Sequence, residues 1–228
     1  VNLFFTKEGY FKKITPQSLR MSGEQKLKDG DEIIQELEFT NNCDLLFFTD
    51  KCQVYKAKAD DFAQTKASVL GDYVAAKLGF DEGENAVKMV VTKDYKGMLL
   101  FAFENGKAAK VPLESYATKT NRKKLTGAYS DKSPLVGLLY MPEDEEVLFK
   151  ASSGNMLLVH TGLLALKTTR STQGVAVLKP KKGHRLFSVE RYKEGTFTNP
   201  KRYRTASLPA RGALPVSDDS KNEQLSLI

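Results

Sequence analysis

Cysteine and histidine are scarce in this sequence, which has two of each in 228 residues. Cys43 and Cys52 are too few for a disulfide scaffold or a thiolate zinc site, so we expect ordinary core or strand residues in a reduced setting. His160 and His184 stand alone, and the chain has no HExxH, GxSxG or GxxxxGKS/T motif. We therefore expect no catalytic residue, no metal site and no cofactor.

Long apolar runs are missing as well. The longest stretches, such as residues 135–141, fall far short of the roughly 20 residues that a membrane-spanning helix needs. The chain starts at Val1, and no basic segment is followed by an apolar core and a small-residue cleavage site. These absences predict a soluble protein without a signal peptide, and the missing initiator Met suggests a piece of a longer polypeptide.

The composition is that of a folded, basic protein. Hydrophobic residues make up 41% of the chain and charged residues 28%, which is enough for one large domain or two small ones. The formal net charge is +7 at pH 7. Such a charge suits an anionic partner, either nucleic acid or an acidic membrane surface, and does not by itself distinguish them.

A strand-turn-strand pattern recurs four times, in residues 3–12, 46–55, 100–109 and 156–165. The turns end in glycine, which takes a positive φ at low cost, except that Cys52 ends the second one. We therefore expect that turn to differ locally. The pattern predicts β-hairpins turning at Lys7–Gly9, Asp50–Cys52, Glu104–Gly106 and His160–Gly162.

Two further elements follow the turns, the first after all four and the second after the first three. One is a basic residue or cluster a few positions before a glycine: Arg20, Lys66, Arg122–Lys124 and Arg170. The other is a short acidic turn that leads into a strand, at residues 29–34, 82–87 and 143–148. The turn positions 9, 52, 106 and 162 are 43, 54 and 56 residues apart, which suits four-stranded blades of a propeller-like array. Residues 63–78 are the best helical candidate, but their place in the repeat favours loop and strand.

These ordered motifs resemble the C-terminal domain of the A subunit of bacterial type IIA DNA topoisomerases, that is, DNA gyrase and topoisomerase IV. The resemblance covers about residues 3–190 and rests on the segments FFTKEGYFKK, DGDEI, LLFFTDKCQVY, LGDY, NRKKLTGAY and STQGV. It implies an all-β fold, the β-pinwheel, a propeller-like disc of about four to five strand-exchanged four-stranded blades. Residues 1–190 would form this DNA-binding domain, and residues 191–228 a basic, proline-containing tail.

The resemblance also implies a function without catalysis in this segment. The family's ATPase lies on a separate B subunit, which would be the partner in the holoenzyme, and the holoenzyme would use ATP and Mg outside this segment. No position here matches the family's cleavage motif, so the tyrosines are interpreted as packing residues; they are Tyr10, Tyr55, Tyr73, Tyr116 and Tyr129. The implied partner is double-stranded DNA in the cytoplasmic nucleoid, with no small-molecule substrate.

Gyrase-like members carry a Gln-Arg-Arg-Gly-Gly-Lys-Gly box in the first blade that clamps DNA. The corresponding residues 22–28 read SGEQKLK, which keep Gln25 and Lys26 but lack the arginines and the paired glycines. The resemblance therefore favours topoisomerase IV over gyrase and implies weak wrapping.

Basic clusters at matching places in the repeat predict the path of the DNA. Lys and Arg displace counterions from phosphates, and this gives sequence-independent, salt-dependent affinity. The expected DNA-binding residues are Arg20, Lys26, Lys28, Lys66, Lys119, Arg122, Lys123, Lys124, Lys132, Lys167, Arg170, Lys179, Lys181, Lys182 and Arg185. A propeller-like module whose basic rim binds an acidic protein remains the alternative from a different class.

Overall fold

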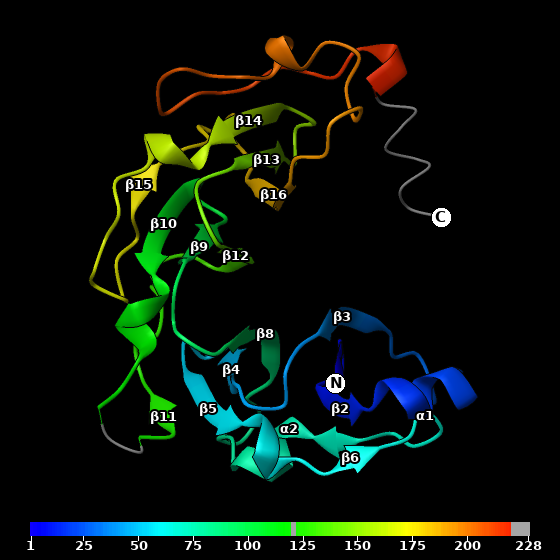
Figure 1. Ribbon diagram of the computed structural model, residues 1–228. Coiled ribbons are helices and arrows are strands. Elements are labelled where there is room, and N and C mark those ends of the chain that lie inside the picture. The colour runs from blue at the N-terminus through cyan, green and yellow to red at the C-terminus, as the bar shows by residue number, and fades with distance from the viewer. Residues whose placement is uncertain (120–121, 220–228) are drawn as a thin grey trace. The chain divides into compact units, whose positions relative to one another are not determined.

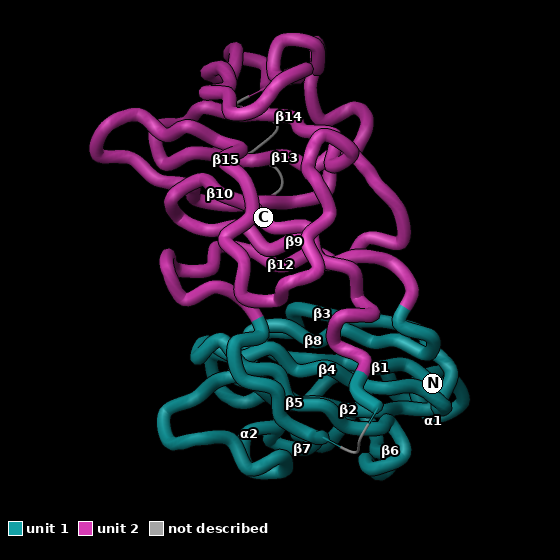
Figure 2. Tube along the Cα trace, turned by 90° about the vertical axis from the view of Figure 1, so that its left-hand side faces the viewer, with its two compact units in different colours: residues 1–95, 118–128 teal, residues 96–117, 129–228 magenta. Residues whose placement is uncertain are grey.

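The computed structural model describes residues 1–119 and 122–219, and its regular structure consists mainly of short strands. The chain divides into two compact units (Figure 2): unit 1 contains residues 1–95 and 118–128, and unit 2 contains residues 96–117 and the chain from residue 129 onward. Within the described residues, no helix is both long enough and apolar enough to cross a membrane. The predicted all-β class is confirmed.

The first sheet of unit 1, blade 1, is built on the hairpin of β1 (Asn2–Thr6) and β2 (Tyr10–Ile14). Three further strands extend it, as Figure 1 shows in part: β3 (Ile33–Glu38) pairs with β1, while β6 (Gln64–Thr65) and β7 (Asp72–Tyr73) pair with β2. The pairing with β6 is parallel and the others are antiparallel.

The second sheet of unit 1, blade 2, has the order β11-β5-β4-β8. Its hairpin consists of β4 (Asp44–Thr49) and β5 (Val54–Lys58), with β8 (Ala86–Thr92) beside β4 and β11 (Lys124–Leu125) beside β5. All three pairings are antiparallel.

The first sheet of unit 2, blade 3, repeats this order as β12-β9-β10-β15. Here β9 (Met98–Phe103) and β10 (Lys107–Pro112) form the hairpin, β12 (Leu135–Met141) pairs with β9, and β15 (Val175–Ala176) pairs with β10.

The second sheet of unit 2, blade 4, has the order β14-β13-β16. Its hairpin is β13 (Glu146–Ala151) with β14 (Met156–His160), and β16 (Leu186–Arg191) pairs with β13. Chain beyond β16 completes the free side of β14 through the isolated bridges Leu158–Arg204 and Met156–Ala213.

The blades exchange strands in the predicted way. In blades 1, 2 and 3, the short strand beside the second hairpin strand comes from chain that follows the next hairpin in the sequence. The described residues contain four blades, which is within the predicted range. We call β3, β8, β12 and β16 the third strands, because each pairs with the first strand of its hairpin.

Single helical turns follow the hairpins and begin at equivalent places. Helix α1 (Pro16–Met21) starts after Thr15, whose hydroxyl accepts a hydrogen bond from the Ser18 N–H. Pro16 fits the first turn because an N–H group at this position would have no hydrogen-bond acceptor within the helix. The corresponding 3-10 turns are η1 (Ala59–Asp61), η2 (Leu113–Tyr116) and η3 (Thr161–Leu163), and η4 (Pro200–Arg202) lies further along the chain.

Three of the four predicted hairpin turns are confirmed, and the fourth is wrong. The apolar run Met156–Val159 is the second strand of its hairpin, and its partner β13 precedes it, so the turn lies at residues 152–155. Residues 160–162, where the turn was predicted, lead into η3. The error arose because β14 is as apolar as the first strands of the other hairpins, which hid its place in the repeat.

The same shift affects the third acidic turn. Residues 143–148 lead into β13, a first hairpin strand, whereas β3 and β8 are third strands. The equivalent loops in unit 2 are residues 131–134 before β12 and residues 181–185 before β16. Glu145 and Glu146 of the acidic run form ion pairs with Arg191 and Arg204.

The turn at Cys52 keeps the conformation of its counterparts. Cys52 has a φ of +56°, in the left-handed region, where the equivalent glycines Gly9, Gly106 and Gly154 have φ values of +91°, +85° and +91°. The turn therefore stays in the left-handed region, and its local difference is a smaller positive φ than at the equivalent glycines. The helical candidate at residues 63–78 contains β6, β7 and, at its end, the short helix α2 (Val74–Leu78).

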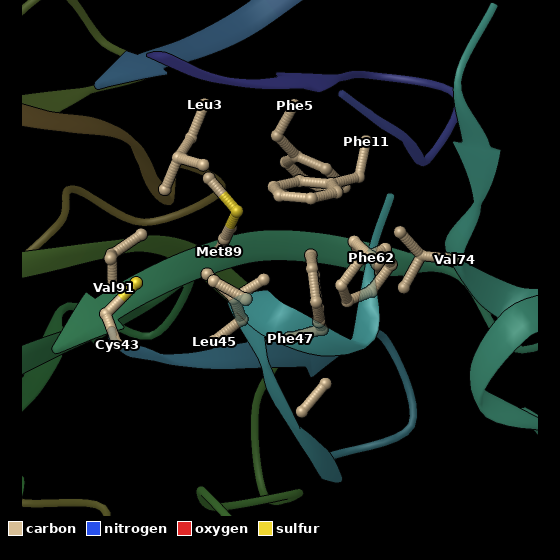
Figure 3. Packing of buried hydrophobic residues seen from close by; sticks show 13 residues of the cluster. Leu3, Phe5, Phe11, Cys43, Leu45, Phe47, Phe62, Val74, Met89 and Val91 are labelled. Atoms are coloured by element: carbon tan, nitrogen blue, oxygen red, sulfur yellow. The ribbon is translucent and has the colours of Figure 1, made fainter. Parts of the chain in front are cut away.

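The core of unit 1 lies between the sheets of blades 1 and 2. Figure 3 shows Leu3, Phe5 and Phe11 of blade 1 facing Phe47 and Met89 of blade 2, all of them nearly inaccessible to solvent. Unit 2 has a corresponding core of Leu100, Phe149, Leu157 and their neighbours. The first hairpin strands bury consecutive apolar side chains, such as Leu45 to Phe48, so both faces of these short sheets are covered, and this burial stabilises them.

The described part of the proline-containing tail packs on blade 4. Phe197 and Tyr203 are buried against Leu148, Met156 and Leu158, and the Tyr203 hydroxyl donates to Asp219. A division of domains near residue 190 stays a prediction, and residues 220–228 of the tail lie outside the described residues, as does Asn121 of the NRKKLTGAY segment.

Candidate nucleic-acid interface

The predicted DNA-binding residues lie mostly on exposed loops, and each unit carries some of them. Unit 1 contains Arg20, Lys26, Lys28, Lys66, Lys119, Arg122, Lys123 and Lys124, of which only Lys124 is partly buried. Unit 2 contains Lys132, Lys167, Arg170, Lys179, Lys181, Lys182 and Arg185, of which Lys167 and Arg170 are partly buried. Arg20 lies within helix α1, and it is therefore not next to an exchanged strand in the sequence.

Lys26 and Lys66 are brought together by a buried lysine. The Lys26 N–H donates to the carbonyl oxygen of Ala67 at 2.8 Å, and the Lys12 ammonium donates to the carbonyls of Lys26 and Ala67, at 3.0 and 3.1 Å. Burial lowers the pKa of Lys12. The two exposed lysines therefore belong to one fixed surface of unit 1, which includes part of the degenerate box.

The cluster Arg122–Lys124 divides into two parts. Arg122 and Lys123 are exposed, and the Lys123 carbonyl oxygen accepts a hydrogen bond from the Lys56 N–H at 2.7 Å. Lys124 instead forms an ion pair with Asp81 at 3.0 Å, and its ammonium lies 5.5 Å from the centroid of the Tyr55 ring. The hydrogen bond to Asp81 raises the pKa of Lys124. Lys124 thus fastens the segment that presents the two exposed cations, Arg122 and Lys123.

A buried carboxylate supports this attachment. Glu84 accepts hydrogen bonds from Thr49, Gln53 and Tyr55 at 2.5–2.6 Å, and Gln53 also donates to Asp81. Burial raises the pKa of Glu84, but these hydrogen bonds lower it by more than burial raises it. The pKa of Glu84 therefore lies below its usual range. The network fixes Asp81 opposite Lys124.

Lys132, Lys167 and Arg170 are constrained to different degrees. Lys132 lies 3.9 Å from Asp131 in a pair whose side chains are both well exposed, so the pair contributes little. The Lys167 N–H donates to the Lys110 carbonyl, and the Arg170 guanidinium donates to the Ser115 carbonyl at 2.9 Å. The Arg170 side chain is therefore held in place by a hydrogen bond within unit 2, whether or not it also contacts a ligand.

The loop at residues 179–185 is fixed to two hairpin turns of unit 2. The N–H groups of Val177 and Leu178 donate to the Gly106 carbonyl just before the loop, and the Leu186 N–H donates to the Glu104 carbonyl just after it. The Arg185 N–H donates to the Ser152 hydroxyl at 3.0 Å. Four predicted cations, Lys179, Lys181, Lys182 and Arg185, therefore lie on one ordered loop.

The loops before the third strands are equivalent in all four blades. In each, the carbonyl oxygen of the last loop residue accepts a hydrogen bond from the N–H of the first turn residue of the hairpin: Lys7 to Glu32 (2.9 Å), Asp50 to Asn85 (3.0 Å), Glu104 to Pro134 (2.9 Å) and Ser152 to Arg185 (2.8 Å).

These equivalent loops carry different charges. Residues 29–32 and 81–85 are acidic, residues 131–134 have one charge of each sign, and residues 181–185 are basic with no acidic residue. Only the loop of blade 4 therefore offers a cluster of cations at this place.

Sequence reasoning missed a set of structural lysines. Lys13, Lys56 and Lys110 occupy the same position after the turn in blades 1, 2 and 3. The Lys13 ammonium donates to the Ala59 carbonyl at 2.7 Å, and the Lys110 ammonium donates to the Thr161 carbonyl at 2.9 Å, at the start of the next blade's helical turn. Counting residues from each turn would have found this set.

The tyrosines interpreted as packing residues are consistent with that role. Tyr55, Tyr116 and Tyr129 are buried, and Tyr129 stacks on Phe101 with centroids 5.5 Å apart. Tyr73 is 41% exposed, but its ring lies 5.3 Å from that of Tyr10. Burial raises the pKa values of Tyr55 and Tyr116, which keeps their hydroxyls protonated.

No protein-family model matches the chain. Among curated proteins, it is 26% identical over 209 residues to the A subunit of DNA gyrase from Streptomyces coelicolor, and the match covers 84% of this chain and 24% of that protein. It is 25% identical over 170 residues to the A subunit of DNA topoisomerase 4 from Staphylococcus epidermidis, where the match covers 72% and 21%. The chain thus spans about a quarter or less of the length of these relatives.

Solved structures share the fold. The C-terminal domain of DNA topoisomerase IV superposes with a TM-score of 0.79 at 22% identity, covering 94% of this chain and 72% of that one. The C-terminal domain of DNA gyrase A superposes with a TM-score of 0.59 at 19% identity, covering 95% and 76%. The chain is therefore homologous to the C-terminal region of the A subunits of DNA gyrase and topoisomerase IV, and it has the β-pinwheel fold.

Proposed function

We propose that this chain is the noncatalytic DNA-binding and DNA-bending domain of an ATP-dependent type IIA topoisomerase A subunit, and that it presents DNA segments for strand passage. The homology to the A subunits of gyrase and topoisomerase IV carries the proposal. The exposed cations on ordered loops of both units support it, because they can contact phosphates without further rearrangement.

Backbone contacts account for this binding without base recognition. Each unit offers lysines and arginines at loop positions, and no helix in the described residues exceeds six residues, which leaves no long recognition helix there for the major groove. Binding is therefore set by phosphate charge and by how easily the DNA bends.

The parent enzyme is of the topoisomerase IV type. Residues 22–28 lack the arginines and paired glycines of a wrapping box, although Lys26 and Lys28 remain exposed. We expect relaxation and unlinking of DNA without net negative supercoiling.

The remaining components belong to the holoenzyme. An ATPase B subunit is the expected partner, and ATP and Mg are used there, so this chain needs no cofactor of its own. A cytoplasmic, nucleoid-associated location follows from a DNA substrate. Neither a membrane nor a small molecule is part of the proposed function.

Salt dependence of DNA binding tests the proposal. If the chain neutralises about five phosphates, log K falls with log salt with a slope of roughly −4 to −5, and unrelated duplex sequences bind alike. Absence of DNA binding at low salt would instead favour a module that binds an acidic protein. Incubation of relaxed plasmid with ATP and both complete subunits, A and B, tests the enzyme type, and negative supercoils would assign it to gyrase.

A further inference from the structure

One loop and one side chain of blade 4 differ from their equivalents in the other blades in a way that bears on DNA binding. The loop before its third strand is basic, whereas the equivalent loops of blades 1 and 2 are acidic. The compared side chain lies two residues after the loop carbonyl that bonds the hairpin turn. This residue is Ile34, Val87 and Val136 in blades 1, 2 and 3, and Phe187 in blade 4. Phe187 is 61% exposed, against 42% for Ile34 and 38% for Val87.

The exposed ring lies directly beside the cations. The Arg185 guanidinium is 5.8 Å from the centroid of the Phe187 ring, and it also contacts Glu104 at 3.3 Å. Within the described residues, the ammonium groups of Lys179, Lys181 and Lys182 have no side-chain partner. An apolar ring with free cations on one side is the combination found where proteins unstack a DNA base step.

We propose that Phe187 is a wedge that enters a base step of the bound duplex and kinks it, while Lys181, Lys182 and Arg185 hold the flanking phosphates. This inference rests on the proposed function, since it requires bound DNA. It adds that the bend is localised at blade 4 and not spread evenly over the contact surface.

The rigidity of the loop supports this assignment. Hydrogen bonds attach its two ends to the hairpin turns at Glu104–Gly106 and at Ser152, and His184 contacts the Ser152 hydroxyl at 3.1 Å. The ring is therefore held at the end of an ordered strand, and little conformational entropy is lost when it inserts.

The equivalent loops of blades 1 and 2 fit this role less well. Three acidic residues in each of the loops 29–32 and 81–85 repel phosphates near Ile34 and Val87. The matched control is therefore Val87→Ala, which removes an apolar side chain at the equivalent position of an acidic blade.

The experiment compares an intact duplex of about 30 base pairs with the same duplex carrying a one-nucleotide gap, where no unstacking cost remains. The wild-type chain should bind the gapped duplex about tenfold more tightly. Phe187→Ala should reduce this preference to near unity, and Val87→Ala should retain it. Lys181→Ala with Lys182→Ala should lower the salt slope by about 2 and keep the preference for the gap.

Different outcomes separate the two proposals. If the wild-type chain binds both duplexes with a steep salt slope but equal affinity, or if Phe187→Ala keeps the preference, the wedge is wrong and DNA binding stands. Loss of all DNA binding by the wild-type chain overturns the proposed function itself. Because Phe187 is exposed, its replacement should leave the melting temperature unchanged, and Phe187→Trp should preserve the gap preference.

Discussion

The hairpins and the loops before the third strands differ in how closely they repeat. The hairpins are nearly the same in all four blades: the turn has a residue with positive φ, and the N–H of the first turn residue bonds the same loop carbonyl. The loops keep that carbonyl but change their charge from acidic to basic. Backbone requirements therefore fix the hairpins, while the loops are free to carry function.

Lysine shows the same contrast. Lys13 and Lys110 lie in hairpin strands with their ammonium groups bonded to backbone carbonyls of the next blade, whereas Lys181 and Lys182 are exposed on a loop. A net positive charge thus mixes structural cations with cations available to a ligand. Substitutions of individual lysines can show where that division lies.

The largest effect on stability is expected where the chain that leads into an exchanged strand packs closely against a hairpin strand. A Cβ added at Gly174, whose φ is +74°, would lie 1.9 Å from the Ala108 carbonyl oxygen, and Gly71 and Gly212 are similarly crowded against Phe11 and Met156. Gly174→Ala should lower the free energy of unfolding by about 3–5 kcal/mol, measured by denaturant titration.

Gly183→Ala is the matched control for this change. Gly183 has a similar φ of +78°, but no atom lies within 4 Å of an added Cβ. Its replacement should cost only the left-handed strain, about 1–2 kcal/mol. Equal destabilisation by both substitutions would show that close packing at Gly174 is unimportant.

The second prediction concerns a buried lysine. Lys110→Met removes the donor to the Thr161 carbonyl and to the Asp144 carboxylate, both at 2.9 Å. The lost hydrogen bonds should lower the free energy of unfolding by about 2–3 kcal/mol. The salt slope of DNA binding should not change, and a lower slope would place Lys110 among the ligand-binding cations.

Acid titration sharpens this test. Burial raises the pKa of Asp144, but the hydrogen bonds from Lys110 and Thr161 lower it by more than burial raises it. The pKa of Asp144 therefore lies below its usual range. This stabilisation is present above the ordinary Asp pKa of about 3.9 and is lost as the pH falls through the lower folded value. The stability difference between wild type and Lys110→Met should therefore narrow below about pH 4.

The sequence predicted the hairpin fold well but not every register. Strand, turn and glycine patterns located the first three hairpins, because each has one clearly apolar first strand before the turn. The fourth failed because β14 is itself apolar and therefore resembles a first strand, although the true turn, at residues 152–155, precedes it. The completion of blade 4 by residues 204–213 depends on contacts distant in sequence, which no local pattern reveals.

Only part of the candidate site could be predicted, because charge clusters are visible in the sequence while contacts between distant residues are not. Exposed loop lysines such as Lys181 and Lys182 were found because charge clusters are visible in the sequence. The Lys124 ion pair with Asp81 was not, since its partner is distant in the chain. The exposure of Phe187 was also hidden, because an aromatic residue in a strand usually packs inside.

A smaller effect is expected at the exposed cluster of unit 1. Replacing Arg122 and Lys123 together by Ala should lower the salt slope of DNA binding by about 2 without changing stability, because both side chains are exposed. Lys221→Ala, outside the described residues, is the control and should change neither quantity. An unaltered slope in the double variant would remove this cluster from the DNA path.

The smallest effect is expected for Lys124, which stands between the two classes of lysine. Its ammonium is engaged by Asp81 and by the Tyr55 ring, although its side chain is 38% exposed. Lys124→Ala should therefore lower the melting temperature by no more than about 3 °C, because pairs open to solvent contribute little. The salt slope should fall by less than one unit, since binding a phosphate would require release from Asp81. Asp81→Asn provides the converse test: it frees the ammonium, so affinity for DNA should rise slightly at low salt. If Lys124→Ala instead lowers the slope as much as loss of Arg122 or Lys123 does, Lys124 contacts DNA directly and its pair with Asp81 does not restrain it.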